Sequence, residues 1–420
     1  MTDTPVHPGY PDHVNAVRLY GPMLGEDPAE LYQRMRREGG PVVPVLLDDD
    51  IPAWFVMGYR ELHHVFSQSR MFGRDSRRWN MWEHIRPDWP LMPGVGWQPT
   101  VLFAEGPERQ RRSGAIGDAL DGLDRTELAM LTEQVADTLI DVFAGDGRAD
   151  LLARYAQLIP ARVIVGLFGL PEADAPELIT NFNIMLDATS ESGAAYQWII
   201  DYMGKFIVGK RAMPGEDLPS RLIEHSARLT DEEIALDLLA VVGSSATTSS
   251  WIGNTLHLML VDDRFSITLQ GGRSSVGQAM NEVLWKEPPL RSTARWATQD
   301  CELGGRRVRR GDMLVLGLAA ANADPQVQPV DDADTGTNRA HMSFGHGEYG
   351  CSYPAPELAE IIAKTAVEVL LDRLPDVDLA VSPGDLGWRR SLWMRTLESL
   401  PVHFAPTAPL GHQPTWDTTL

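Results

Sequence analysis

Residues 344–351 have the sequence FGHGEYGC, which is the most informative stretch of the chain. Glycines at positions 345, 347 and 350 allow the backbone to turn tightly and to approach a flat ligand closely. The pattern predicts a helix over 357–373, and the N-terminal end of a helix there favours the thiolate form of Cys351. A cysteine thiolate is the axial ligand with which haem iron cleaves O–O bonds. The segment therefore indicates an iron ligand at Cys351.

Two other interpretations of this segment stay open from the residues alone. A lone cysteine is commonly an inert, buried side chain. The three glycines also match G-x-G-x-x-G, a dinucleotide fingerprint that needs a strand before it and an acidic residue about 20 positions after it. Here the short sequence HMSF (341–344) follows the polar residues 331–340, and little chain remains for the second half of such a fold. A dinucleotide-dependent enzyme is therefore kept as a third hypothesis.

The composition excludes several classes of function. The 420 residues carry 37 basic and 58 acidic side chains, and a net charge of -21 argues against nucleic-acid binding. Cys301 and Cys351 are too few for a disulfide framework or a multi-cysteine zinc site. The polar N-terminus predicts no signal peptide, and no apolar stretch is long enough for a membrane span. We expect a cytoplasmic protein that does not bind a membrane.

Hydrophobic periodicity predicts a mainly α protein with small β-sheets, in the α+β class. Residues 1–405 are expected to form a single domain with a β-rich part at about 40–60, and residues 406–420 a flexible tail. The long irregular segment 73–107 contains four tryptophans, which favour an ordered, substrate-facing loop. Helices are predicted over 28–38, 125–143, 147–169, 231–260, 274–286 and 357–373, and extended segments over 41–47, 53–58, 313–321 and 378–381.

The cysteine segment resembles the haem loop F-G-x-G-x-H-x-C of the cytochrome P450 family, with Tyr349 in place of the usual histidine. Residues 243–248 (GSSATT), followed by IGN at 252–254, are similar to the distal helix of that family. The resemblance implies a triangular single-domain fold with haem b between the distal helix and the cysteine loop. It also implies that Phe344, Gly345, Gly347 and His341 lie on the haem side of this loop.

The same resemblance assigns the distal helix to proton delivery. A threonine hydroxyl can bond a carbonyl one turn back, open the helix and hold a water molecule. Thr247 occupies this position, and Ala246 replaces the acidic residue usual before it. The catalytic residues implied are Thr247, Thr248, Ser244 and Ser245. The alternative is a threonine hydroxyl that is satisfied within its own helix.

Cationic side chains are expected to hold the haem propionates. Residues 105–112 (EGPERQRR) resemble the start of the family's C helix, with Arg109 in place of a histidine and Ser113 in place of an arginine. Arg109 and Arg112 can still form a cationic pair, because residues i and i+3 share a helix face. Arg295 matches a second propionate arginine, and Tyr349 can donate from its hydroxyl. The alternative for residues 109–112 is a solvated basic patch.

The chain departs from the family at its E-x-x-R pair, which here is Glu282-Val283-Leu284-Trp285. The arginine usual between Pro325 and His341 is also absent, which suggests a rebuilt network in which Trp285 fills volume. Glu282 must then find other donors, such as backbone N–H groups or Arg339. E-x-x-W followed by CSYPAPE at 351–357 resembles an actinomycete branch of the family that lacks E-x-x-R.

The resemblance implies an oxidoreductase that uses O₂ and electrons from a ferredoxin and its ferredoxin reductase. We expect hydroxylation or oxidative coupling of an apolar or aromatic small molecule in secondary metabolism. The second hypothesis is a haem-binding protein without turnover that acts as a partner in a biosynthetic cluster. Each tryptophan expected at the pocket can instead be an ordinary residue of the hydrophobic core. The expected pocket residues are Trp79, Trp82, Trp89, Trp97, Gly243, Ala246, Thr293, Trp296, Trp393 and Met394.

Overall fold

The computed structural model describes residues 10–174, 177, 178, 180, 181, 184, 192–266, 274–327 and 338–411. The chain divides into two units, each assembled from segments that are far apart in the sequence. Unit 1 comprises Met1–Gln98, Leu284–Cys351 and Trp388–Arg395, and unit 2 comprises Pro99–Val283, Ser352–Gly387 and Thr396–Leu420.

A six-stranded sheet forms the centre of unit 1, in the order β1-β2-β3-β9-β6-β4. Pairing is parallel for β1–β2 and β3–β9 and antiparallel for β2–β3, β9–β6 and β6–β4. The strands are β1 (Val17–Arg18), β2 (Val42–Leu47), β3 (Ile51–Val56), β4 (Phe72–Gly73), β6 (Ser292–Ala297) and β9 (Met313–Gly317).

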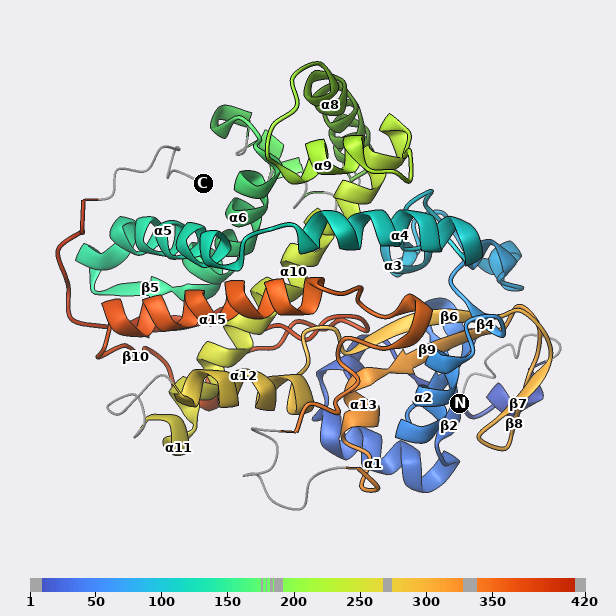
Figure 1. Cartoon of the computed structure of the whole chain (residues 1–420). Coiled ribbons are helices and arrows are strands. Elements are labelled where there is room, and N and C mark those ends of the chain that lie inside the picture. The colour runs from blue at the N-terminus through green and yellow to red at the C-terminus, as the bar shows by residue number, and fades with distance from the viewer. Residues whose placement is uncertain are drawn as a thin grey trace. The chain divides into compact units, whose positions relative to one another are not determined.

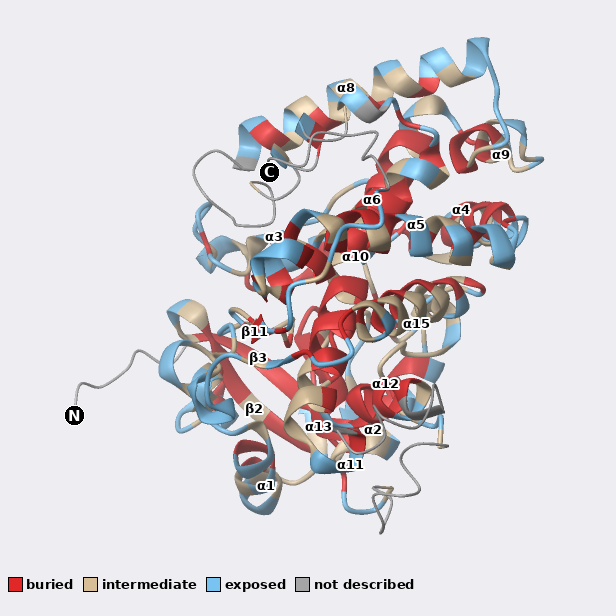
Figure 2. Ribbon diagram, turned by 90° about the vertical axis from the view of Figure 1, so that its left-hand side faces the viewer, coloured by how far each residue is buried: buried red, intermediate tan, exposed pale blue. Residues whose placement is uncertain are grey.

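Alternate residues of these strands enter two hydrophobic clusters, because successive side chains of a strand point to opposite faces. Val43 and Val45 of β2 belong to one cluster, and Val42 belongs to the other. Strands β2 and β3 are almost wholly buried (Figure 2). Unit 1 also contains α1 (Pro28–Gly39), α2 (Tyr59–Ser67), α3 (Met92–Val95), α13 (Leu318–Asn322) and the hairpin of β7 (Cys301–Leu303) and β8 (Arg306–Val308).

Unit 2 is mainly helical, and α10 runs through its core. This 31-residue helix begins with a capping box in which Thr230 and Glu233 bond each other's backbone N–H groups. It packs against α6, α8 and α15, and α15 packs against α5 (Figure 1). The helices are α4 (Gly106–Asp121), α5 (Arg125–Phe143), α6 (Leu158–Phe168), α8 (Ser192–Ala212), α9 (Leu218–Glu224), α10 (Asp231–Val261), α11 (Asp263–Ser266), α12 (Ser274–Lys286, whose last three residues belong to unit 1) and α15 (Ala355–Arg373).

A small antiparallel sheet in the order β10-β11-β5 completes unit 2. Its strands are β5 (Arg148–Asp150), β10 (Asp378–Leu379) and β11 (Pro401–His403). The segment that was expected to be a flexible tail forms hydrogen bonds at the C-terminal end of α5. Thr407 N donates to Ala144 O at 2.9 Å, and Leu410 N donates to Asp141 Oδ1 at 3.0 Å. Residues 412–420 lie outside the described residues.

The predicted α+β class is confirmed, and most predicted helices are present with shifts of a few residues. Two predicted segments were wrong in part. The helix predicted over 147–169 starts as β5, because residues 148–150 pair with β11. The extended segment predicted over 313–321 ends at Gly317 and continues as α13. Within the described ranges, no helix combines the length and the apolar character that crossing a membrane requires.

Candidate haem site

The cysteine loop in unit 1 is a tight turn closed by its own backbone. Cys351 N donates to Phe344 O at 2.9 Å, and Gly345 N donates to Met342 O at 2.8 Å. Gly345 and Gly347 have φ values of 61° and 70°, in the left-handed region that favours glycine. Cys351, at the end of this turn, is an exposed residue.

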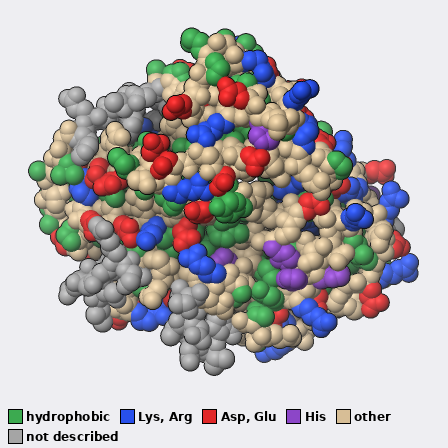
Figure 3. All heavy atoms as spheres, in the orientation of Figure 1, with side chains coloured by type: hydrophobic (Ala, Val, Ile, Leu, Met, Phe, Trp, Pro, Cys, Tyr) green, Lys and Arg blue, Asp and Glu red, His purple; other side chains and the backbone are tan. Residues whose placement is uncertain are grey.

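Helix α2 packs against this loop closely enough to require a glycine. A Cβ on Gly347 would lie 2.6 Å from Phe66 O. The ring of His346 packs on Phe66 with centroids 5.3 Å apart and on His63 at 4.3 Å. Burial and the neighbouring His63 lower the pKa of His346. Figure 3 shows histidine side chains gathered where Figure 1 labels α2.

Strand β6 places a buried guanidinium beside the loop. Arg295 is 1% exposed and lies with its guanidinium carbon 5.1 Å from the Tyr349 ring centroid and 5.6 Å from that of Phe66. It donates to Ala294 O at 2.8 Å and to Tyr349 O at 3.4 Å. The structure therefore brings together the predicted residues Arg295, Tyr349 and Cys351 on one loop and the adjoining strand.

A polar network holds the start of the loop to the end of α12. The Ser343 hydroxyl donates to Leu284 O at 2.5 Å, and Asn322 Nδ2 donates to the same carbonyl at 2.9 Å. Asn322 Oδ1 accepts from Met342 N at 2.7 Å. One buried asparagine thus fixes the backbone two residues before Phe344. The rings of the predicted haem-side residues His341 and Phe344 lie with their centroids 5.8 Å apart and are tilted by 53°.

The polar groups of Glu282 and Trp285, the first and last residues of the E-x-x-W segment, have hydrogen-bond partners that the sequence did not specify. The Glu282 carboxylate, 4% exposed, accepts from Arg264 Nη2 of α11 at 2.8 Å. Trp285 is buried and donates from Nε1 to Asn338 O at 2.7 Å. A cation from a different helix therefore meets the carboxylate, while the tryptophan both fills volume and supplies a hydrogen bond.

In unit 2, the predicted catalytic hydroxyls lie on an uninterrupted stretch of α10. Thr247 Oγ1 donates to Ser244 O at 2.8 Å, and Thr248 Oγ1 donates to the same carbonyl at 3.2 Å. Ser244 Oγ donates to Val241 O at 2.6 Å. Ser245 and Thr248 are buried, Ser244 is exposed, and Gly243, Ala246 and Thr247 are half-buried. Ser244 and Thr247 therefore form the accessible hydroxyl pair on this helix.

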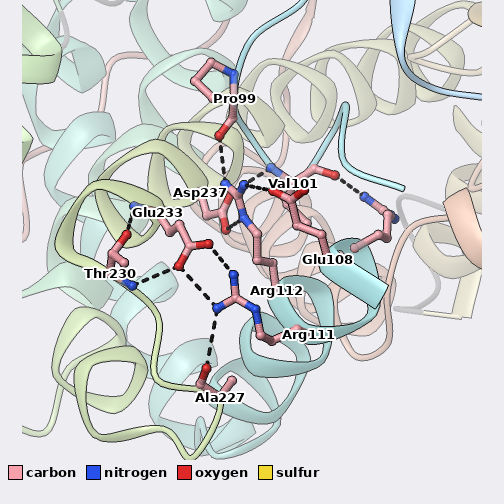
Figure 4. A network of polar contacts seen from close by, with 10 residues as sticks. Pro99, Val101, Glu108, Arg111, Arg112, Ala227, Thr230, Glu233 and Asp237 are labelled. Atoms are coloured by element: carbon pink, nitrogen blue, oxygen red, sulfur yellow. Dashed lines mark hydrogen bonds and ion pairs between the residues drawn. The ribbon is translucent and has the colours of Figure 1, made fainter. Parts of the chain in front are cut away.

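The arginines of α4 have partners within unit 2 (Figure 4). Arg112 Nε and Nη2 donate to the two oxygens of Asp237 on α10 at 2.8 and 2.5 Å, and Nη2 also donates to Pro99 O at 2.9 Å. Burial alone would lower the pKa of Arg112, but the hydrogen bonds and charge of Asp237 outweigh it and raise that pKa. Arg109 Nη1 donates to Val101 O at 2.6 Å. Both guanidiniums are buried, which differs from a solvated basic patch.

The expected pocket residues of unit 1 divide into core and surface. Trp79, Trp89 and Trp296 are buried in one hydrophobic cluster, against which Trp82 and Trp393 pack. Trp97 is 37% exposed and lies under the Arg77 guanidinium at 4.1 Å. The remaining ones are half-buried: Thr293 accepts a hydrogen bond from Arg74, and Met394 forms a β-bridge with Leu290.

Asp237 and Asp312 were not predicted from the sequence. Asp237 interrupts the apolar run IALDLLA at 234–240, and a lone carboxylate inside such a run is the signal that could have revealed a buried ion pair. Asp312 is 2% exposed and accepts from the Tyr10 hydroxyl at 2.8 Å and from Trp54 Nε1 at 3.0 Å.

These groups fit a haem. The glycines let the loop close on itself and pack against α2, the exposed Cys351 can supply a thiolate to iron, and Arg295 is a cation of the kind that binds a carboxylate. The region before Gly345 lacks the strand of a dinucleotide fingerprint, since none occurs in the described residues 338–344. The fold and the loop together define a haem-thiolate protein.

Comparisons with known proteins support this class. The chain is 30% identical over 390 residues to cytochrome P450 107B1 of Saccharopolyspora erythraea (90% of this chain and 95% of that protein). It is 30% identical over 397 residues to the cytochrome P450 monooxygenase PikC of Streptomyces venezuelae (91% and 92%). The structure of testosterone-bound CYP154C4 from Streptomyces superposes with a TM-score of 0.82 at 27% identity, covering 94% of this chain and 99% of that one. No family model matches the sequence.

The chain therefore belongs to the cytochrome P450 family. The predicted resemblance, haem b as cofactor, and a P450-type monooxygenase as the class of enzyme are confirmed. The roles of individual site residues stay predictions.

Proposed function

We propose that Cys351 is the thiolate ligand of the haem iron in a monooxygenase of secondary metabolism. The observation that carries this proposal is the closed loop, with its left-handed glycines, that bears the exposed Cys351 two residues after Tyr349, whose ring contacts the Arg295 guanidinium. Bound haem supplies the reductive activation of O₂ that oxidises the substrate. The chain's own residues bind and orient the substrate, tune the thiolate and deliver protons.

The test is the absorption spectrum of the reduced, CO-bound protein. The wild-type protein should show the red-shifted band of a thiolate-ligated haem, and Cys351→Ser should abolish it. Cys301→Ser is the matched control, because Cys301 is the second free cysteine and lies in β7. Retention of the band in Cys351→Ser would move the ligand elsewhere.

The substrate that we propose is an apolar or aromatic small molecule, oxidised by hydroxylation or by oxidative coupling. PksS of Bacillus subtilis is a polyketide-biosynthesis P450, and CxnD is a P450 for C–S bond formation in chuangxinmycin biosynthesis. A vitamin D(3) 25-hydroxylase of Pseudonocardia autotrophica is also similar to the chain, so hydroxylation and bond formation both occur among similar proteins. Electrons would arrive from a ferredoxin and its ferredoxin reductase. Incubation of the protein with a surrogate pair, NADPH and a panel of candidate substrates, followed by mass spectrometry, would detect either product.

Ser244 and Thr247 are the hydroxyls that we propose for proton delivery, with Ser245 and Thr248 in support. Ala246 cannot carry a proton, whereas the accessible Ser244 and Thr247 hydroxyls can relay one through water. Thr247→Ala should raise the fraction of NADPH that is lost as hydrogen peroxide. Ser250→Ala, one turn further along the same helix and bonded to Ala246 O, should leave that fraction unchanged.

A further inference from the structure

A polar cavity of about 400 Å³ opens on unit 1 at the turn that joins β8 to β9. This volume lies within the range of small-molecule sites in proteins. The lining includes Tyr10, Asn80, His84, Asp300, Arg309 and Arg310. None of these residues is among those predicted for the haem or for the substrate, so the cavity is a separate candidate site.

One buried carboxylate holds the walls of this cavity together. Asp312 is 2% exposed, and its Oδ1 accepts from the Tyr10 hydroxyl and from Asn80 Nδ2, each at 2.8 Å. Its Oδ2 accepts from Trp54 Nε1 at 3.0 Å and from Arg309 N at 2.9 Å. The charge of Asp312 is thus met by four donors from four segments of the chain. A buried network with its bonds made is rigid, so the walls keep their arrangement.

The turn is also packed closely against the segment that carries Asn80. Asn80 N donates to Gly311 O at 3.1 Å. A Cβ on Gly311 would lie 2.9 Å from Arg78 O, so the two backbones approach more closely than another residue would allow. The backbone that carries Arg309 and Arg310 is therefore fixed on one side of the cavity.

Both arginines of the turn keep N–H donors that a ligand can use. The Arg309 guanidinium carbon lies 4.1 Å from the centroid of the Tyr10 ring. Stacking uses the face of a guanidinium and leaves its edge donors for a ligand. Arg309 Nε is 3.9 Å from Asp312 Oδ1, which is beyond hydrogen-bond distance. Arg310 is exposed, and its backbone N–H, not its guanidinium, donates to Asp300 Oδ1 at 2.9 Å.

The charge balance at this turn favours an anionic ligand. Arg307 Nη2 lies 3.6 Å from Asp300 Oδ2. The backbone N–H of Arg310 and the charge of Arg307 lower the pKa of Asp300, so this carboxylate stays ionised next to a cation of its own. Arg307, Arg309 and Arg310 outnumber the carboxylates Asp300 and Asp312, although the whole chain has a net charge of -21. Guanidinium forks bind carboxylate and phosphate groups through paired hydrogen bonds.

We propose that this cavity binds a small oxyanion, a molecule that bears a carboxylate or a phosphate group, through Arg309 and Arg310. The proposal does not rest on the ligation of haem by Cys351, because it uses only the residues around this turn. Tyr10 is the positioning residue that supports the Arg309 guanidinium, and Asp312 positions the walls. Because the walls come from distant segments, the site exists only in the folded chain, and a bound anion stabilises that state.

The test is isothermal titration calorimetry of the full-length protein with pyrophosphate and with citrate at low ionic strength. The wild type should bind at least one of them saturably, with a Kd of about 1 mM or below. Arg309→Gln and Arg310→Gln should each weaken binding about tenfold, since a hydrogen bond between charged groups is lost. Arg307→Gln is the matched control, because it removes the same charge from the same hairpin, and Arg307 is 81% exposed and outside the lining. It should change the Kd less than about twofold.

A second readout locates the anion in the wild-type protein and needs no variant to fold. The bound anion should protect Arg309 and Arg310, but not Arg307, from modification by phenylglyoxal, as read by peptide mass spectrometry. Tighter binding of pyrophosphate would assign the site to phosphate-bearing ligands, and tighter binding of citrate to carboxylates. Equal weakening in all three variants would mean general attraction of anions and would overturn the proposal. So would the lack of saturable binding of both probes, or modification of Arg309 and Arg310 at an unchanged rate.

Discussion

Breaking the Arg112–Asp237 pair is expected to be among the most destabilising polar substitutions in unit 2. The two side chains are 3% and 0% exposed, and Asp237 Oδ1 also accepts from Val101 N at 2.7 Å. Removal of one partner leaves the other charge buried without compensation, which costs about 3–5 kcal/mol. Asp237→Asn and Arg112→Met should each lower the free energy of unfolding by an amount in this range.

The same two helices offer an internal control. Arg111 of α4 pairs with Glu233 of α10, but these side chains are 36% and 21% exposed. Solvent-exposed pairs contribute about 0–1 kcal/mol, so Glu233→Gln should have a small effect. Urea unfolding of the holoprotein, followed by far-ultraviolet circular dichroism and by the haem absorption band, measures both pairs in the same way.

The double variant Arg112→Met/Asp237→Leu makes the comparison stricter. Replacement of both charges by apolar groups removes the uncompensated charge, so the double variant should be more stable than either single variant. The coupling energy between positions 112 and 237 should then be several times that between 111 and 233. Additive effects at 112 and 237, or a loss in Asp237→Asn no larger than in Glu233→Gln, would refute the reasoning.

Three further results are expected from other parts of the chain. Trp285→Phe removes the hydrogen bond to Asn338 O and should cost about 1 kcal/mol in urea unfolding while the thiolate band persists. Gly347→Ala sets a Cβ 2.6 Å from a backbone carbonyl oxygen of α2 at a φ of 70°, and should lower the haem content measured as the pyridine haemochrome. The hydrogen bond from Arg111 lowers the pKa of Glu233 below 4.5, so this carboxylate stabilises the fold above that pH and the benefit is lost as the pH falls through the lowered value. The difference in unfolding free energy between the wild type and Glu233→Gln should therefore shrink below about pH 4.5, and a constant difference would contradict this assignment.

Sequence patterns predicted the elements whose signals are local. Helix α10 was predicted almost to its ends because apolar spacing and acidic residues in its first turn act together. Strand β6 was missed, since the sequence STARWA shows no clear alternation and the strand forms through pairing with residues that are distant in the chain. Tertiary pairing of this kind is not encoded in a short window.

In the candidate site too, residues with a local sequence signal were predicted, and partners that are distant in the chain were not. The cysteine loop was found because its glycines and ligand lie within eight residues. The need for other hydrogen-bond donors beside Glu282 also followed from the sequence, but Arg264 as such a donor did not, because the two residues lie on different helices and no local pattern links them. The partner of Arg112 lies 125 positions away and was missed for the same reason.

A shift of one residue on α4, relative to the family pattern, sets the direction in which its arginine projects. Successive residues of an α-helix are turned by about 100° around the axis, so an arginine at position 112 projects from a different side than one at 113. The structure places Arg112 against Asp237 of α10, and Ser113 occupies the position at which the family pattern has its propionate arginine. Asp237 within an apolar helix therefore gives Arg112 a buried anionic partner, so the pair joins α4 to α10 within unit 2.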